Sequence, residues 1–349
     1  MLTIGYIGNG KSTNRYHLPF VLQRKQRLHV KTIYERNPDH RAWDTIEGVH
    51  YTSDLNELLE DKEIDLIVVC TMQNSHYDYA KLVLQHDKHV LVEKPFMMTL
   101  SQAQEIFALA KEKGKIAECY QNRRYDSDFL TTQSVIESDK LGELYEMEMH
   151  FDYYRPQAVY NSTYSRYEGF LYGHACHTLD QVISYFGIPD SVDYQVKCLC
   201  GKGKMNDYFD LDLFYGESLK ISVKSSFFRV KSRPSFVAYG KKGMFVKETK
   251  DLQETDLKKF YLPDHEDFGI DSFHEYGVLT YADEHEQLHE EKIASVRGDY
   301  GRVYDALYDA IVLGKERVVK EEQTLAVMEI LEKGSALCEE RYAEGNTIL

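Results

Sequence analysis

The sequence lacks any apolar segment long enough to cross a membrane, and it lacks an excess of positive charge. Its apolar runs are typified by residues 64–70, far short of the about 20 residues that a membrane span needs. The formal net charge of -15 argues against nucleic acid, whose phosphates require a basic surface, and against anionic membranes. We therefore expect neither nucleic acid nor a membrane as a partner.

The sequence also lacks a disulfide framework, internal repeats and low-complexity tracts. The six cysteines are scattered along a large chain, which is typical of free thiols in a reducing compartment. The N-terminus has no basic region before its first apolar residues, so we expect no signal peptide and a cytoplasmic protein. Cys198-x-Cys200 does not have a zinc-site spacing and fits two residues of a strand.

Two halves with different patterns are present in the 349 residues, which are enough for two domains with their own cores. Up to residue 121, apolar strand patterns alternate with helical ones. This alternation predicts right-handed crossovers and a doubly wound parallel sheet. The second half, residues 122–349, forms the second expected domain, and its C-terminal helices are candidates to pack back on the first.

A glycine-rich turn follows the first expected strand, residues 2–7. The turn consists of Gly8, Asn9, Gly10, Lys11, Ser12 and Thr13. A strand, a Gly-x-Gly turn and a following helical segment at 18–23 are the context of a dinucleotide-binding fingerprint. The first glycine allows the tight turn, and the second lets the backbone approach a pyrophosphate at the helix N-terminus. Thr13 replaces a third glycine that serves helix–strand packing. We expect these six residues to bind NAD or NADP.

Glu35 and Arg36, at the end of the second expected strand (30–34), favour different cofactors. Glu35 lies about 20 residues after the turn, where an acid binds the adenosine ribose hydroxyls of NAD. Arg36 favours NADP, because a guanidinium pairs with a 2′-phosphate and stacks on adenine. The residues alone leave NAD and NADP open. The alternative to a cofactor role is that Glu35 and Arg36 form a surface pair at the strand end.

A polar loop follows the buried strand at 64–70 and precedes a helix at 77–86. Ligands of open α/β sheets bind at the carboxyl ends of the strands. We therefore expect Thr71, Asn74 and His76, in this loop, to contact the cofactor.

The next strand ends in Glu93-Lys94-Pro95. Pro95 cannot donate to a strand ladder, and the residue before a proline is held extended. Lys94 is therefore delivered at the carboxyl end of a strand, together with Glu93, where both are expected to contact the cofactor. The alternative for Lys94 alone is a solvated lysine at a strand end.

Beyond residue 122 the pattern changes to period-two alternation. Strands are expected within 145–151, 192–199, 208–215 and 219–225, and a hairpin joins 235–239 to 244–247. Helices are expected at 129–138, 171–186, 304–313 and 323–341, and a loop at 249–276. The pattern predicts an α+β domain with a large, mostly antiparallel open sheet that is covered on one face by helices.

The expected helix 171–186 carries His174, His177 and Gln181 on one face, with Asp180 within reach of His177. A metal is not expected, because His-x-x-His is a poor zinc spacing on a helix and no third strong ligand is placed. A structural histidine bonded to a backbone carbonyl is the alternative to a catalytic one.

Taken together, these motifs resemble the Gfo/Idh/MocA oxidoreductases, and the resemblance covers essentially the whole chain. Gly8-Asn9-Gly10, Glu93-Lys94-Pro95 and His177-x-x-Asp180 carry it. Three further stretches resemble the subgroup of NADP-dependent scyllo-inositol dehydrogenases: residues 120–126, Tyr153-Tyr154-Arg155-Pro156 and Gly298-Asp299-Tyr300.

The resemblance implies that Lys94 contacts the nicotinamide side and the substrate hydroxyl, and that His177 is the general acid and base. Histidine suits proton transfer near neutral pH, and an ammonium stabilises negative charge on an oxygen. Many members carry an aspartate four residues before the histidine, where this chain has Gly173. His174 or Asp180 would then orient His177.

The implied substrate is a sugar, an inositol or a related polyol, in a homodimer or homotetramer. Asn122, Tyr154, Arg155, His174 and Asp180 are the expected substrate-binding residues beside Lys94 and His177. Most of the tyrosines between residues 153 and 172 have a simpler explanation, which is that they cover a face of the sheet.

Two other functions remain open. Gly173 favours a nucleotide-sensing or sugar-sensing protein that kept the fold and lost turnover. A reductase of a non-sugar carbonyl, such as an imine or a tetrapyrrole, is the third function, because the resembled family includes such members.

Overall fold

The computed structural model describes residues 1–343, in two compact units. The first unit comprises Met1–Asn122, Glu254–Phe268 and Asp299–Met328. The second comprises Arg123–Gln253, Gly269–Gly298 and the chain from Glu329 on. Within the described residues, no helix combines the length and the apolar character that a membrane crossing requires.

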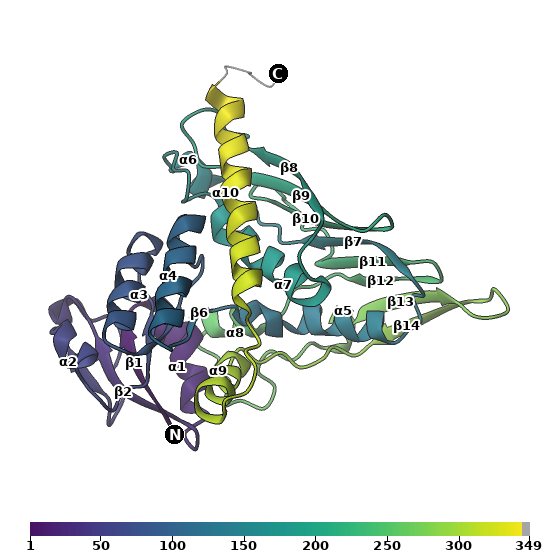
Figure 1. The fold of residues 1–349 in the computed structure, drawn as a ribbon. Coiled ribbons are helices and arrows are strands. Elements are labelled where there is room, and N and C mark those ends of the chain that lie inside the picture. Colours follow the sequence, from purple (N-terminus) through teal and green to yellow (C-terminus); the bar gives the residue numbers. More distant parts are fainter. Residues whose placement is uncertain (344–349) are drawn as a thin grey trace. The chain divides into compact units, whose positions relative to one another are not determined.

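The first unit is built on a six-stranded parallel sheet in the order β3-β2-β1-β4-β5-β6 (Figure 1). This is the strand order of dinucleotide-binding doubly wound folds, in which the order reverses beside β1. The strands are β1 (Leu2–Ile7), β2 (Leu28–Tyr34), β3 (His50–Thr52), β4 (Leu66–Val69), β5 (His89–Val92) and β6 (Ala117–Cys119). The helical segments among them are η1 (Thr13–His17), α1 (Leu18–Leu22), η2 (Pro38–His40), α2 (Leu55–Leu59), η3 (Gln73–Ser75), α3 (His76–Gln85) and α4 (Leu100–Glu112).

Local sequence explains these elements well. All four residues of β4 are fully buried, as expected for a strand with both faces covered. Helix α4 begins with a capping box between Thr99 and Gln102, and it ends before Gly114, whose φ of 61° continues the chain in a left-handed conformation.

Two late segments of the chain complete the first unit. Leu257, in α8 (Gln253–Lys258), and Phe268 pack with Phe20 and Tyr300 in one buried cluster. Helix α9 (Arg302–Leu313) is fixed at its start by Arg24, which forms ion pairs with Asp299 and Asp305. These contacts explain part of the Gly298-Asp299-Tyr300 motif: its acid anchors an arginine, and its tyrosine fills a core.

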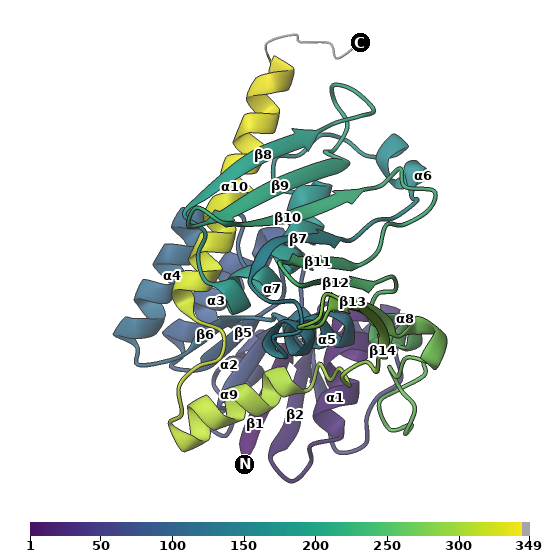
Figure 2. The same cartoon turned by 90° about the vertical axis from the view of Figure 1, so that its right-hand side faces the viewer.

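The second unit is built on an eight-stranded sheet in the order β14-β13-β12-β11-β7-β10-β9-β8 (Figure 2). The pair β7–β10 is parallel, and the other neighbours are antiparallel. The strands are β7 (Leu144–His150), β8 (Ser191–Lys197), β9 (Tyr208–Tyr215), β10 (Leu219–Ser226), β11 (Phe236–Gly240), β12 (Gly243–Lys247), β13 (Gly277–Ala282) and β14 (Leu288–Ile293). The helical segments are η4 (Asn122–Tyr125), at the junction of the units, α5 (Ser127–Glu137), α6 (Pro156–Tyr160), η5 (Leu171–Ala175), α7 (Cys176–Phe186), η6 (Phe273–Glu275) and α10 (Glu321–Ala343), which begins in the first unit.

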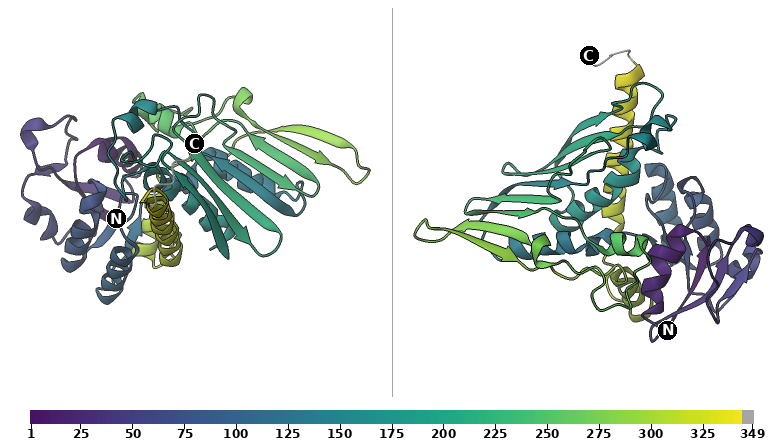
Figure 3. Two further views of the ribbon diagram at one scale, coloured as in Figure 1. Left: turned by 90° about the horizontal axis from the view of Figure 1, so that it is seen from above. Right: turned by 180° about the vertical axis from the view of Figure 1, so that it is seen from behind.

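Helices cover one face of this sheet, as the views in Figure 3 show. Helix α5 packs on β11 and β12, and α7 packs on β10. The expected α/β class, with a doubly wound sheet and a second, mostly antiparallel sheet, is confirmed.

Several details differ from the sequence-based expectation, among them strands β13 and β14 and helix α6, which were not expected. The stretch 249–276, expected to be a loop, contains the short helix α8. The expected helix 171–186 begins with a π-helical turn, η5, and a second π-helical turn, η1, follows the glycine-rich turn. Periodicity analysis assumes 3.6 residues per turn, so it misses a wider turn, and such turns occur often at functional sites.

We predict that Phe20→Ala destabilises the first unit, because it empties the cluster that holds the late segment 254–268. A loss of about 3–5 kcal/mol in the free energy of unfolding is expected for a buried phenylalanine. Phe273→Ala is the matched control, because Phe273 is 62% exposed whereas Phe20 is 1% exposed. Denaturant unfolding followed by fluorescence of the single tryptophan, Trp43, measures the effect. Equal unfolding midpoints for the two variants would contradict the predicted destabilisation by Phe20→Ala.

Candidate active site

The two glycines of the turn after β1 differ in what surrounds them. Gly8 has φ 108°, and a β-carbon there would lie 2.5 Å from the carbonyl oxygen of Cys70. A β-carbon at Gly10 would meet no protein atom within 4 Å. The protein's own packing therefore requires glycine at position 8, whereas Gly10 leaves its backbone open to a ligand. A tightly packed Gly8 together with an open Gly10 suits the binding of a pyrophosphate to this turn.

A pocket of about 540 Å³ lies at the carboxyl ends of β1, β2 and β4. This is where the strand order reverses, the usual ligand position in open α/β sheets. Thr71 and Asn74, two of the expected cofactor-binding residues, line it together with Gly8 and Arg36. The full lining is Ile7, Gly8, Tyr34, Arg36, Thr71, Met72, Asn74, Ser75 and Tyr79.

Glu35 is buried at the end of β2, where its charge is balanced within the unit. The Arg41 guanidinium donates to both of its carboxylate oxygens, and the Asn9 amide donates to Oε2 at 3.0 Å. Hydrogen bonds from Arg41 lower the pKa of Glu35 despite its burial. Arg41 was not expected from the sequence, because it lies in an irregular loop with no motif.

His76 is buried and is not among the residues that line the pocket at the carboxyl ends of β1, β2 and β4. Its ring is buried, with Nδ1 at 3.0 Å from the carbonyl oxygen of Pro95 and Nε2 at 3.1 Å from that of Thr71. Burial lowers the pKa of this imidazole. In the structure His76 thus joins the loop after β4 to the turn after β5, and a role toward the cofactor stays a prediction.

The remaining residues of the glycine-rich turn serve different purposes. The Thr13 hydroxyl, fully buried, donates to the carbonyl oxygen of Gly8 at 2.6 Å and closes the turn. Lys11 is exposed, and Ser12 donates to the carboxylate of Glu93. The turn is therefore tied directly to the end of β5.

Glu93 is the centre of this arrangement. Its Oε1 accepts hydrogen bonds from Ser12 and from His17 Nε2 at 3.0 Å, and its Oε2 accepts from the backbone N–H of Lys94 at 3.0 Å. Burial alone would raise the pKa of Glu93, but His17, the Lys94 charge and the Ser12 hydroxyl outweigh it and lower the pKa to about 2. The carboxylate thereby fixes the backbone that carries Lys94.

A buried chain of side chains continues from Glu93 through the first unit. His17 Nδ1 lies 2.6 Å from the Tyr304 hydroxyl, which in turn lies 3.1 Å from the Tyr6 hydroxyl. The Tyr120 ring lies against the His17 ring, with the centroids 3.9 Å apart. Sequence analysis missed His17 and Tyr304, because a histidine in a π-helical turn and a tyrosine almost 300 residues away share no local pattern.

The second unit holds the histidine helix. His177 lies in α7 and is 6% exposed, and His174 lies in the preceding turn η5, against the Tyr153 ring. Both carboxylate oxygens of Asp180 accept hydrogen bonds from Arg124, each at 2.7 Å. Burial raises the pKa of Asp180 despite this partner. Asp180 therefore has a positioning role toward η4, and its expected contact with substrate stays a prediction.

Tyr154 and Arg155, two other expected substrate-binding residues, belong to the second unit, and Asn122 belongs to the first. The Arg155 guanidinium lies 4.0 Å from the centroid of the Tyr153 ring, and Tyr154 is 58% exposed. Asn122 is buried at the end of the first unit. A β-carbon at Gly173 would meet no atom within 4 Å, so the protein's packing does not exclude a side chain there.

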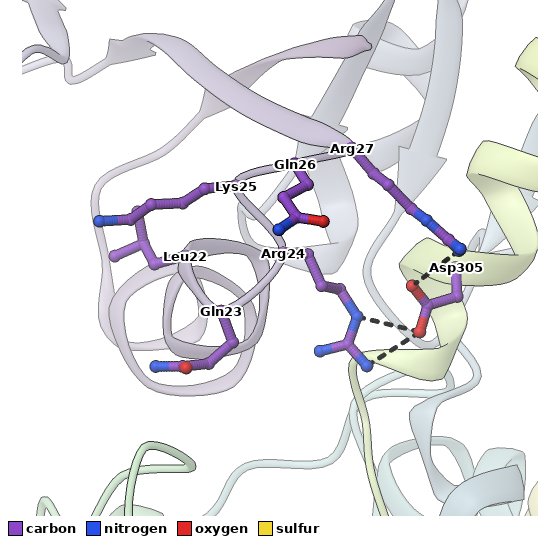
Figure 4. A pocket seen from close by; sticks show the side chains of 7 residues that line it. All are labelled: Leu22, Gln23, Arg24, Lys25, Gln26, Arg27 and Asp305. Atoms are coloured by element: carbon purple, nitrogen blue, oxygen red, sulfur yellow. Dashed lines mark hydrogen bonds and ion pairs between the residues drawn. The ribbon is translucent and has the colours of Figure 1, made fainter.

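A second pocket, of about 700 Å³, lies at the opposite edge of the first sheet (Figure 4). Leu22, Gln23, Arg24, Lys25, Gln26, Arg27 and Asp305 line it. The carbonyl of Arg27 accepts from the backbone of Leu2, at the amino end of β1, whereas ligands bind at carboxyl ends. Asp305 pairs with Arg24 and Arg27, so this pocket lies beside the anchor of α9. Among residues 1–343, no three His, Cys, Asp or Glu side chains are placed to hold a metal.

The strand order and the open Gly10 backbone indicate a dinucleotide-binding fold. The comparison with known families agrees. Residues 2–121 match the description "oxidoreductase family, NAD-binding Rossmann fold", and residues 133–342 match its C-terminal alpha/beta domain. The chain belongs to the Gfo/Idh/MocA oxidoreductase family, and its cofactor is NAD or NADP.

Individual relatives align over nearly the whole chain. The uncharacterized oxidoreductase YhhX of Escherichia coli is 47% identical over 96% of both chains. The scyllo-inositol 2-dehydrogenase (NADP(+)) IolW of Bacillus subtilis is 30% identical, over 95% of this chain and 92% of its own. The crystal structure of an oxidoreductase from Bacillus cereus superimposes with a TM-score of 0.90 at 42% identity, over 96% of each chain.

We predict that Glu93→Gln lowers the free energy of unfolding at pH 7 by about 3 kcal/mol, which corresponds to the lowering of the pKa of this carboxyl from 4.5 to about 2 on folding. The difference in stability between the variant and wild type should narrow as the pH falls from about 4.5 to about 2, because over that window the unfolded wild-type chain binds a proton that the folded protein does not yet bind.

Glu57→Gln is the matched control for this prediction. Glu57 pairs with His50 at 2.9 Å, but both side chains are more than half exposed, so the change should have little effect on the free energy of unfolding. Denaturant titrations at several pH values measure both variants. A gap for Glu93→Gln that stays constant from pH 7 to pH 2 would contradict the assignment.

Proposed function

We propose that this protein interconverts a secondary alcohol and a ketone on a sugar, an inositol or a related polyol. The observation that carries the proposal is the anchoring of the Glu93-Lys94 backbone at the end of β5, in the unit that binds the dinucleotide. A lysine held there by a buried carboxylate is suited to act on a substrate oxygen. The name of the relative IolW supports an inositol as the substrate class.

In this proposal His177 accepts the proton of the substrate hydroxyl, or returns it to the ketone, and Lys94 stabilises the substrate oxygen. Oxidation of the alcohol requires that its proton be removed as the hydride leaves, and histidine performs this near neutral pH. The Lys94 ammonium favours the negative charge that develops on the oxygen. The bound nicotinamide supplies the hydride chemistry, and the protein supplies binding and orientation. Tyr154, Arg155, His174 and Asn122 are the proposed substrate contacts.

We further propose NADP as the preferred cofactor. Arg41 balances the negative charge of Glu35, which would otherwise repel a 2′-phosphate. Arg36 adds a second guanidinium at the same strand end and lines the pocket. Together these three residues leave a net positive charge at the ribose position, and the name of IolW specifies NADP(+).

A catalytically weak sensor is the second candidate function. Gly173 favours it, because the carboxylate that many family members place there is absent although there is room for a side chain. Nucleotide binding without turnover of any alcohol or ketone distinguishes a sensor from an enzyme.

The catalytic assignment predicts that Lys94→Ala and His177→Ala each lower kcat by about 10²-fold or more. Nucleotide affinity, titrated with NADPH, should stay within a few-fold of wild type. Lys241→Ala and His289→Ala are controls on exposed side chains. Near-normal kcat in both active-site variants would contradict the proposed roles.

The cofactor assignment predicts that Arg36→Ala weakens NADPH binding by about tenfold or more, because a charge-assisted contact is lost. NADH binding should change much less, since NADH has no 2′-phosphate. Arg27→Ala, at the opposite edge of the same sheet, is the control. Equal losses for NADPH and NADH would exclude recognition of the 2′-phosphate by Arg36.

A further inference from the structure

The segment Glu254–Phe268 comes from between β12 and β13 of the second sheet, yet it belongs to the first unit. Leu257 and Phe268 anchor it in the cluster with Phe20 and Tyr300. Phe20 lies in α1, directly after the π-helical turn η1. The segment is therefore fixed next to the helical turn that follows the glycine-rich loop.

Between these two anchors the chain turns at Phe260. Phe260 has φ 60°, unusual for a large side chain, and 58% of its surface is exposed. Its ring lies 5.8 Å from the Trp43 ring, between centroids, and 5.3 Å from the Arg15 guanidinium. Trp43 comes from the loop after β2, and Arg15 comes from η1. Three separate segments thus meet at one point.

The two elements that Phe260 joins each follow a position where the dinucleotide is expected to bind. A pyrophosphate on the glycine-rich turn lies at the start of η1, which carries Arg15. An adenosine ribose at Glu35 lies at the start of the loop that carries Trp43. A dinucleotide that occupies both positions spans the two elements that Phe260 joins.

Arg15 supplies a second observation that indicates an anion. Its Nε atom is buried without a hydrogen-bond partner, and no carboxylate in the described residues forms an ion pair with it. A guanidinium that stacks on an aromatic ring keeps its edge N–H groups available for phosphate oxygens. The charge of the pyrophosphate would satisfy this arginine.

We propose that Arg15, Trp43 and Phe260 form a latch over the bound dinucleotide. Arg15 pairs with its phosphates, and the Trp43–Phe260 ring pair closes over its adenosine end and slows its release. The latch rests on the cofactor site used in the proposed function, but it concerns nucleotide binding and release rather than turnover.

Nucleotide binding tests the latch without reference to catalysis. NADPH is titrated into wild type, Arg15→Gln and Phe260→Ala, and its dissociation is timed by dilution into excess NADP(+). We expect a Kd about tenfold higher for Arg15→Gln. We expect dissociation about tenfold faster for Phe260→Ala, since a closing aromatic contact is lost. NADPH should also change the emission of Trp43, the only tryptophan.

Matched controls separate the latch from general effects. Arg27→Gln removes a cation at the opposite edge of the sheet, and Phe273→Ala removes an exposed ring in the second unit. Phe260→Leu, a milder change, serves if Phe260→Ala lowers the unfolding midpoint. Wild-type Kd and dissociation rate in folded Arg15 and Phe260 variants would overturn the latch and leave the proposed function intact. If the wild-type protein bound neither NADPH nor NADP(+), the latch and the proposed function would both be overturned.

Discussion

The buried carboxylate of Glu93 is the interaction on which the candidate active site depends. It accepts hydrogen bonds from the glycine-rich turn through Ser12, from the helical turn through His17, and from the Lys94 backbone. A charge in this position is costly unless every acceptor is used, which explains why so many donors surround it. The glycine-rich turn and the proposed catalytic lysine are consequently fixed by one group.

The second half of the chain contributes to the first unit in a similar way. Tyr304 extends the Glu93–His17 pair to Tyr6, and Tyr300 closes the cluster that holds the segment with Phe260. The nucleotide-binding unit is therefore completed by residues far from the glycine-rich turn in sequence. In the second unit, the Arg124–Asp180 pair fixes the start of that unit to the histidine helix. Both units thus use buried, hydrogen-bonded carboxylates to place irregular segments beside regular ones.

Sequence analysis predicted the elements that follow from local rules. Alternating strand and helix patterns predicted the doubly wound sheet, which the structure confirms. The glycine-rich turn and Glu35 lie at the carboxyl ends of β1 and β2, where the sequence placed them, and their contact with the nucleotide stays a prediction. What it missed depends on tertiary contacts: the π-helical turns around His17 and His174, the partner Arg41 of Glu35, and the late segments that return to the first unit. No period or motif encodes a contact between residues that are hundreds of positions apart.

The most direct measurement of the proposed function is the absorbance of reduced nicotinamide with purified protein and NADP(+), across a panel of inositols, sugars and other polyols. We expect NADPH to form with at least one compound of the panel, and NADPH to be consumed with the corresponding ketone. Tight NADPH binding with no absorbance change in either direction, at high protein concentration, would contradict the proposed dehydrogenase and favour the sensor.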